Sequence, residues 1–102
     1  MQNNKQVYIT LNHMDDFMDY PAFLNVGQEL KLRKQKEDPY DDEAIAVFRN
    51  DHQCACVANS VSTVARGTSS AGRIYDQIED EAKCIVRFVV MEHGVAIAQL
   101  CD

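Results

Sequence analysis

The sequence has no run of about 20 consecutive apolar residues, which is the length that a membrane-spanning helix needs. Its first residues, Met1 to Lys5, are polar and lack the apolar core of a signal peptide. Internal repeats, low-complexity tracts and linker-like segments are also missing. We therefore expect one soluble, cytoplasmic domain over residues 1–102, with no contact to a membrane.

Basic residues are few. The chain has 10 lysines and arginines against 16 aspartates and glutamates, which gives a net charge of −6. Proteins that bind nucleic acid through the phosphate backbone usually carry a basic surface, so the charge balance argues against strong binding of that kind. A small pocket that holds the end of a strand by stacking and a few hydrogen bonds stays possible.

The residue sets that enzymes use are also missing. The sequence offers no nucleophile with a base and an orienting group, no glycine-rich phosphate loop with a lysine, and no pair of metal ligands at a characteristic spacing. His13 with Asp15, Asp16 and Asp19 suggests a metal site, but a polar loop or a single helical turn with an acidic face explains them as well. We predict no catalytic activity, no cofactor and no bound metal.

The 4 cysteines are Cys54, Cys56, Cys84 and Cys101. Their spacing does not match the paired knuckles of common zinc sites, and a disulfide is rare in the cytosol. We expect reduced thiols in a core, because free cysteine is often buried. Cys54 and Cys56 alternate within a β-like segment, which predicts that they face the same side of a sheet.

Alternating and β-branched segments predict a mainly β fold. In segment 28–35, for example, Leu30 and Leu32 alternate with charged residues, as in a half-buried strand. Asn50-Asp51 predicts a hairpin turn. With one or two short helices, about six strands fit a small OB- or SH3-like β-barrel, which leaves no sheet edge exposed. The expected strands are 7–11, 28–35, 44–48, 54–58, 84–90 and 95–100.

A helix is expected between the fourth and fifth strands, with Thr68, Ser69 or Ser70 as its N-cap and Ile74 and Ile78 on its apolar face. The amides at its start, near Arg66 and Arg73, suggest a weak anion site. An ordinary capped helix explains the same residues.

The most informative stretch runs from Glu37 to Phe48. Asp38-Pro39 predicts a turn, because proline fixes its own φ and favours an extended residue before it. Asp41 and Asp42 are suited to bonds with local backbone amides. Tyr40 lies between the proline and a carboxylate, at the edge of a strand, and we expect its ring and hydroxyl on a loop rather than in the core.

These residues resemble the HIRAN family, whose motif (N/D)-P-Y-D-x-x-A-I-x-V is present as Asp38 to Asp41 and Ala44 to Val47. Val26 to Leu32 resembles the family's apolar-Gly-x-x-Leu-x-Leu segment, and the run from Asn59 to Arg73 resembles its stand-alone bacterial members. The resemblance implies a compact OB-like barrel that captures the 3′ end of single-stranded DNA. It also shows a difference, because the loop before Gly27 is acidic where DNA-end-binding members carry basic and aromatic residues.

Two functions follow as hypotheses. The first is a module that binds single-stranded DNA or its 3′ end. Tyr40 then stacks on a base, Asp41 and Asp38 accept hydrogen bonds from a sugar hydroxyl or base edge, and four cations contact phosphate: Arg33, Lys34, Arg66 and Arg73. The second is an acidic module that binds a basic protein partner and no nucleic acid. The positions of these charges on the fold discriminate between the two.

Overall fold

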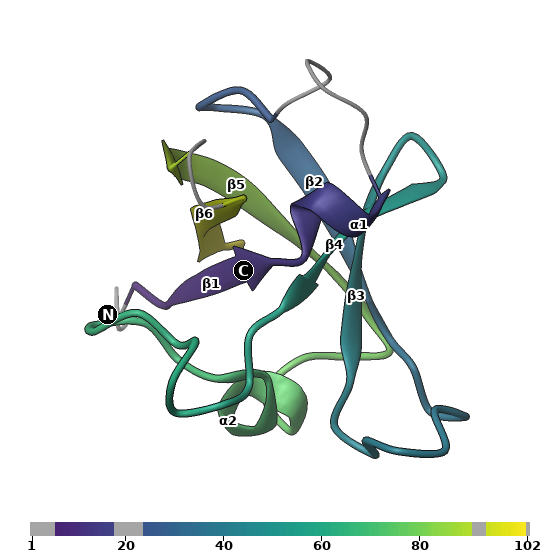
Figure 1. Ribbon diagram of the computed structural model, residues 1–102. Helices are drawn as coiled ribbons and strands as arrows, with labels where there is room; N and C mark the ends of the chain where they lie inside the picture. Colours follow the sequence, from purple (N-terminus) through teal and green to yellow (C-terminus); the bar gives the residue numbers. More distant parts are fainter. Residues whose placement is uncertain (1–5, 18–23, 91–93, 102) are drawn as a thin grey trace, which may run out of the picture.

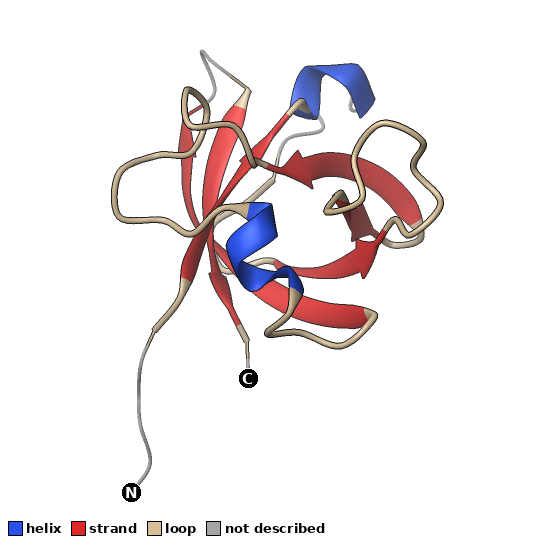
Figure 2. Ribbon diagram, turned by 90° about the horizontal axis from the view of Figure 1, so that it is seen from below, coloured by secondary structure: helices blue, strands red, loops and turns tan. Residues whose placement is uncertain are grey.

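A computed structural model describes residues 6–17, 24–90 and 94–101. Six strands form a closed antiparallel barrel in the order β1-β4-β3-β2-β5-β6, with a helix between β4 and β5, as predicted. The elements are β1 (Tyr8–Asn12), α1 (Met14–Phe17), β2 (Glu29–Lys34), β3 (Ile45–Arg49), β4 (His52–Val57), α2 (Ala71–Tyr75), β5 (Glu81–Val90) and β6 (Val95–Leu100). Figure 1 shows α2 below the barrel, and Figure 2 shows it lying across that end.

The core forms because alternate side chains of each strand point into the barrel. Leu30 and Leu32 of β2 are buried, while Lys31 between them stays partly exposed. The buried cluster also contains residues from β1, β3, β5 and β6, and Ile74 of α2 closes one end. None of the described residues belongs to a helix that is long and apolar enough to cross a bilayer.

The Asn50-Asp51 hairpin forms as predicted. Both residues have positive φ, 52° and 72°, which is the conformation of a type I′ turn between twisted strands. Of the three predicted N-cap candidates, Ser70 is the N-cap, and its hydroxyl accepts a hydrogen bond from the amide of Arg73 at 3.2 Å. The predicted turn at residues 92–94 lies mostly outside the described residues.

One prediction about β4 is wrong. A bulge between β3 and β4 pairs Val47 with Ala55 and Phe48 with Gln53, so that Cys54 has no partner across the ladder. Cys54 is therefore buried in the core, whereas Cys56 lies on the outer face. All four cysteines are free thiols, two of them buried and two partly exposed.

A hydrogen-bond network fixes segment 58–72 beside β1. The buried hydroxyl of Thr10 accepts from the amide of Ala65 at 3.0 Å and lies 2.8 Å from the hydroxyl of Thr68. The amide of Ser69 donates to the carbonyl of Tyr8 at 2.7 Å. The Asn59-to-Arg73 run thus has a structural role in placing α2 against the barrel.

Candidate binding cleft

A cleft of about 460 Å³ lies on the outer face of β3 and β4. Ala46 and Cys56, which pair across these strands, are among the residues that line it. His13 and Phe17 also line it, and Asp38 and Asp41 reach it from the β2–β3 loop. The lining residues are Asn12, His13, Phe17, Gln35, Asp38, Asp41, Ala44, Ile45, Ala46, Gln53, Cys56, Val57, Ala58, Asn59, Ser60 and Thr63; we call this the acceptor cleft.

The loop that carries Tyr40 is held by carboxylates. Oδ1 of Asp38 accepts from the amides of Tyr40 and Asp41, at 2.8 and 3.0 Å. Oδ1 of Asp41 accepts from the amide of Glu43 at 2.9 Å. The bond predicted for Asp41 is therefore present, whereas the other two amides donate to Asp38 rather than to Asp42, for which the sequence suggested this role. Tyr40 is 95% exposed, so its ring is presented to solvent as expected.

Most polar donors of the cleft are already engaged. The amide nitrogen of Gln35 donates to the carbonyl of Arg33, and that of Gln53 to the carbonyl of Ala55. The side-chain nitrogen of Asn59 donates to Glu43, and the hydroxyl of Thr63 donates to the carbonyl of Ser60.

By contrast, Oδ1 of Asn12 is buried and has no hydrogen-bond partner among the described residues. A buried polar atom without a partner carries a desolvation cost, and this oxygen is not accessible to a ligand. The acceptors that the cleft offers to a ligand are therefore mainly the carboxylates of Asp38 and Asp41.

The charge of the cleft is negative. Of its described lining residues, Asp38 and Asp41 are acidic and none is a lysine or an arginine. Burial raises the pKa of the Cys56 thiol, and the charges of Asp16 and Asp38 raise that pKa further. A raised pKa keeps this thiol protonated at neutral pH, so it is not activated as a nucleophile. His13 contacts the carboxylate of Asp16 at 3.1 Å.

The four predicted phosphate contacts lie in different places. Arg33 and Lys34 are neighbours on β2 and point to opposite faces, because strand side chains alternate. The Lys34 ammonium lies 4.4 Å from the centre of the Tyr75 ring. Arg66 lies in the exposed turn before Gly67, and Arg73 is on the exposed side of α2.

The start of α2 is contacted from within the chain rather than left open. Oδ1 of Asn59 accepts from the amide of Gly72 at 2.8 Å, and the side-chain nitrogen of Asn59 donates to Glu43 at 3.3 Å. A Cβ at Gly72 would lie 2.5 Å from the Glu43 carboxylate, so a larger residue here would displace the end of that side chain. A carboxylate of the β2–β3 loop thus lies where the sequence suggested an anion site.

The described residues contain no group of three or more metal-ligating side chains close enough to hold an ion. Asp19 and the side chain of Asp15, which belonged to the metal hypothesis, lie outside the described part. Sequence reasoning missed Asn12, Asn59 and Cys56 as cleft residues. Of these three, only Asn59 was indicated by the sequence, because it is the first residue of the run that resembles stand-alone bacterial HIRAN members.

No family model, curated protein or solved structure matches this chain. The HIRAN resemblance therefore rests on the motifs themselves. The OB-like barrel agrees with the fold that this resemblance implies.

Proposed function

We propose that this protein is a HIRAN-like, non-catalytic module that binds the 3′ end of a single-stranded nucleic acid in the acceptor cleft. The observation that carries the proposal is the combination of an exposed tyrosine with a cleft that offers acceptors and contains no cation among its described lining. Within a strand, phosphates flank every sugar. At a 3′ end the terminal sugar carries a hydroxyl instead, which an acidic cleft accepts without repulsion between like charges.

The proposed roles follow from the geometry. Tyr40 stacks on a base, since an aromatic face exposed on a loop suits any base. The Oδ1 atoms of Asp38 and Asp41 hold the loop, and their Oδ2 atoms accept from the terminal hydroxyl or base edge.

The acidity of the cleft also favours a second candidate. Asp38, Asp41 and the nearby Asp16 suit the ammonium or guanidinium of a basic protein segment. This candidate does not involve nucleic acid. It predicts that the protein binds a lysine-rich peptide and that no oligonucleotide competes with this peptide.

Fluorescence anisotropy with two oligonucleotides, one ending in a 3′-hydroxyl and the other in a 3′-phosphate, tests the proposal at low salt. Tyr40→Ala should weaken binding about 5- to 150-fold, because stacking is worth about 1–3 kcal/mol per base. Asp41→Asn keeps the Oδ1 acceptor for the turn and replaces Oδ2 by a donor. This variant should retain its melting temperature and lose its preference for the 3′-hydroxyl.

Tyr75→Phe is the control, because Tyr75 is a second tyrosine that lies on α2, outside the lining of the acceptor cleft. It should bind like the wild type. Failure of the wild type to bind either oligonucleotide, together with binding of the lysine-rich peptide, would replace the proposal by the second candidate.

A further inference from the structure

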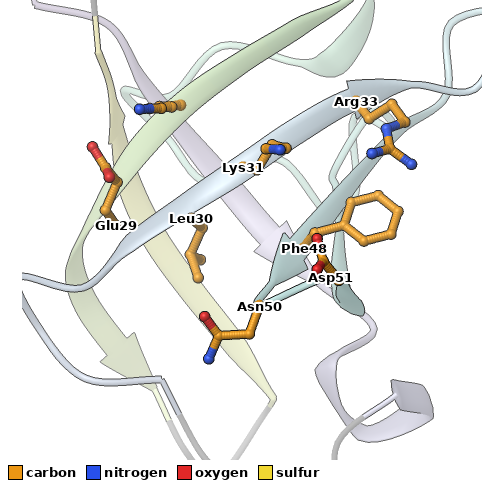
Figure 3. A pocket seen from close by; sticks show the side chains of 8 residues that line it. Glu29, Leu30, Lys31, Arg33, Phe48, Asn50 and Asp51 are labelled. Atoms are coloured by element: carbon orange, nitrogen blue, oxygen red, sulfur yellow. The ribbon is translucent and has the colours of Figure 1, made fainter.

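The acceptor cleft continues into a depression along β2. Gln35 and Asp38 line the cleft and also a second hollow of about 520 Å³. The second hollow shares Arg33 and Phe48 with a third hollow of about 500 Å³, which Figure 3 shows from close by. A chain that leaves the cleft therefore has a continuous path over the outer faces of β2, β3 and β5.

Aromatic and cationic side chains meet on this path. The Arg33 guanidinium carbon lies 4.8 Å from the centre of the Phe48 ring, and Figure 3 shows the two groups facing each other. Lys31 pairs with Phe48 on one side and with Lys83 on the other, so three adjacent strands contribute. We call Lys31, Arg33, Phe48 and Lys83 the β2 strip.

The pairing of Lys31 with Lys83 points to an anionic ligand. Like charges directly opposite each other on a sheet destabilise it. A phosphate between the two ammonium groups would relieve that repulsion. The aromatic ring beside them supplies the second element of single-strand recognition, which combines backbone cations with stacking.

One carboxylate restrains these cations in the unbound protein. Glu81 accepts from Nε of Arg33 at 3.1 Å and lies 3.9 Å from Nζ of Lys31. All three side chains are 43–50% exposed, and exposed ion pairs are weak enough for a phosphate to compete. Glu29 and Asp51 also line the third hollow, which limits the affinity and makes it sensitive to salt.

We propose that a single strand whose 3′ end occupies the acceptor cleft continues over the β2 strip, with one base on the Phe48 ring and phosphates beside Lys31, Arg33 and Lys83. The inference rests on the proposed function and adds the path of the strand. Of the four cations that the sequence suggested as phosphate contacts, this path keeps only Arg33. It adds Lys31 and Lys83.

The length of the ligand separates the two sites. A thymidine dinucleotide fills only the cleft, whereas an octanucleotide is long enough to reach the strip, within the range of about 4–16 nucleotides per OB fold. We expect the octanucleotide to bind more tightly, with a salt slope more negative by about 2, as expected for three phosphate contacts on a single strand. Phe48→Leu should weaken octanucleotide binding at least about 5-fold and leave the dinucleotide unchanged.

Phe88→Leu is the matched control, because Phe88 is an exposed phenylalanine on β5 outside the strip. It should change neither affinity. Thermal unfolding of both variants identifies any loss of binding that comes from loss of fold.

Glu81→Gln gives the most specific test, because it should improve binding. Releasing Arg33 and Lys31 should tighten octanucleotide binding about 2- to 5-fold, the factor that corresponds to one exposed ion pair. Glu79→Gln removes the same charge from the link before β5 and should have a smaller effect. If both variants change the octanucleotide affinity equally, the change comes from net charge alone, and the proposed path over the β2 strip is overturned.

The outcomes distinguish the two proposals. If binding depends on Tyr40 and on the 3′-hydroxyl but not on oligonucleotide length, the strand path over the β2 strip is overturned and 3′-end binding in the cleft stands. If binding depends on length, Phe48 and Glu81 but not on Tyr40 or the 3′-hydroxyl, 3′-end binding in the cleft is overturned and a nucleic-acid site on the β2 strip stands. Absence of binding by either oligonucleotide overturns both.

Discussion

At the residue scale, short polar side chains determine where the loops lie. Asp38 organises the β2–β3 loop through two backbone amides, and Asn59 joins that loop to α2 through Glu43. Thr10 has the same role on β1, where it is fully buried and bonded to Ala65 and Thr68. Such bonds add little net stability when formed, but a buried group that loses its partner is costly.

Thr10→Val should therefore destabilise the protein by about 1–3 kcal/mol, because valine has the same shape and leaves the amide of Ala65 and the hydroxyl of Thr68 without this partner. Urea unfolding measures the change. Thr63→Val is the control, since Thr63 is exposed and its hydroxyl bonds only a local carbonyl. A change below about 0.5 kcal/mol in Thr10→Val, the range of surface substitutions, would contradict the role of this network.

At the element scale, the hairpin between β3 and β4 carries local strain. Asn50 and Asp51 both have positive φ, which is unfavourable for a residue with a Cβ and least so for asparagine and aspartate. The turn is nevertheless the one whose twist matches the flanking strands.

Asp51→Gly should stabilise the protein by about 0.5–1 kcal/mol, because Asn-Gly is the preferred sequence of this turn and glycine adopts φ near 72° without a steric penalty. The midpoint of urea unfolding should rise at an unchanged slope. Asp42→Gly is a control at an exposed loop residue that does not have positive φ, and it should not stabilise. A loss of stability in Asp51→Gly would mean that the aspartate side chain itself holds the turn.

The strands were predictable because their signal is local. Alternation, or a short apolar run with β-branched residues, located the strands, and a Ser/Thr cluster indicated the helix start within a residue or two. The bulge at Cys54 was not predictable, since it depends on how β3 and β4 align in the closed barrel. The motif located Tyr40, Asp38 and Asp41, but the approach of Asn12 and Asn59 to them depends on contacts between segments that are far apart in sequence.

At the scale of the whole molecule, the buried thiols make stability depend on alkaline pH. Burial raises the pKa of Cys54 from 9.0 to about 11 and that of Cys84 from 9.0 to about 12. Below pH 9 both thiols are neutral in the folded and unfolded chains, and their burial carries no charge cost. Above it the unfolded chain loses these protons first, so stability falls as the pH rises toward the folded-state values.

The wild type should therefore lose on the order of 1 kcal/mol per buried thiol between about pH 8 and pH 10, in addition to the change caused by lysines and tyrosines. Cys84→Ala should be less stable at pH 8 but show a shallower loss, which melting temperatures at the two pH values measure. Cys101→Ala is the control, because Cys101 is only partly buried. Identical pH slopes in all three proteins would contradict the contribution of Cys84.

The closure of the barrel by β1 and β6 has a consequence for synthesis and folding. Tyr8 pairs with Gln99 and Leu11 with Ala96, so the hydrogen bonds of the first strand are complete only when the last strand has been added. Contacts of such long sequence separation slow folding, typically to the millisecond-to-second range for barrels of this kind. During translation β1 remains an open edge until β6 has left the ribosome, and the vulnerable species is a five-stranded chain whose apolar inner face is still accessible to chaperones or to aggregation.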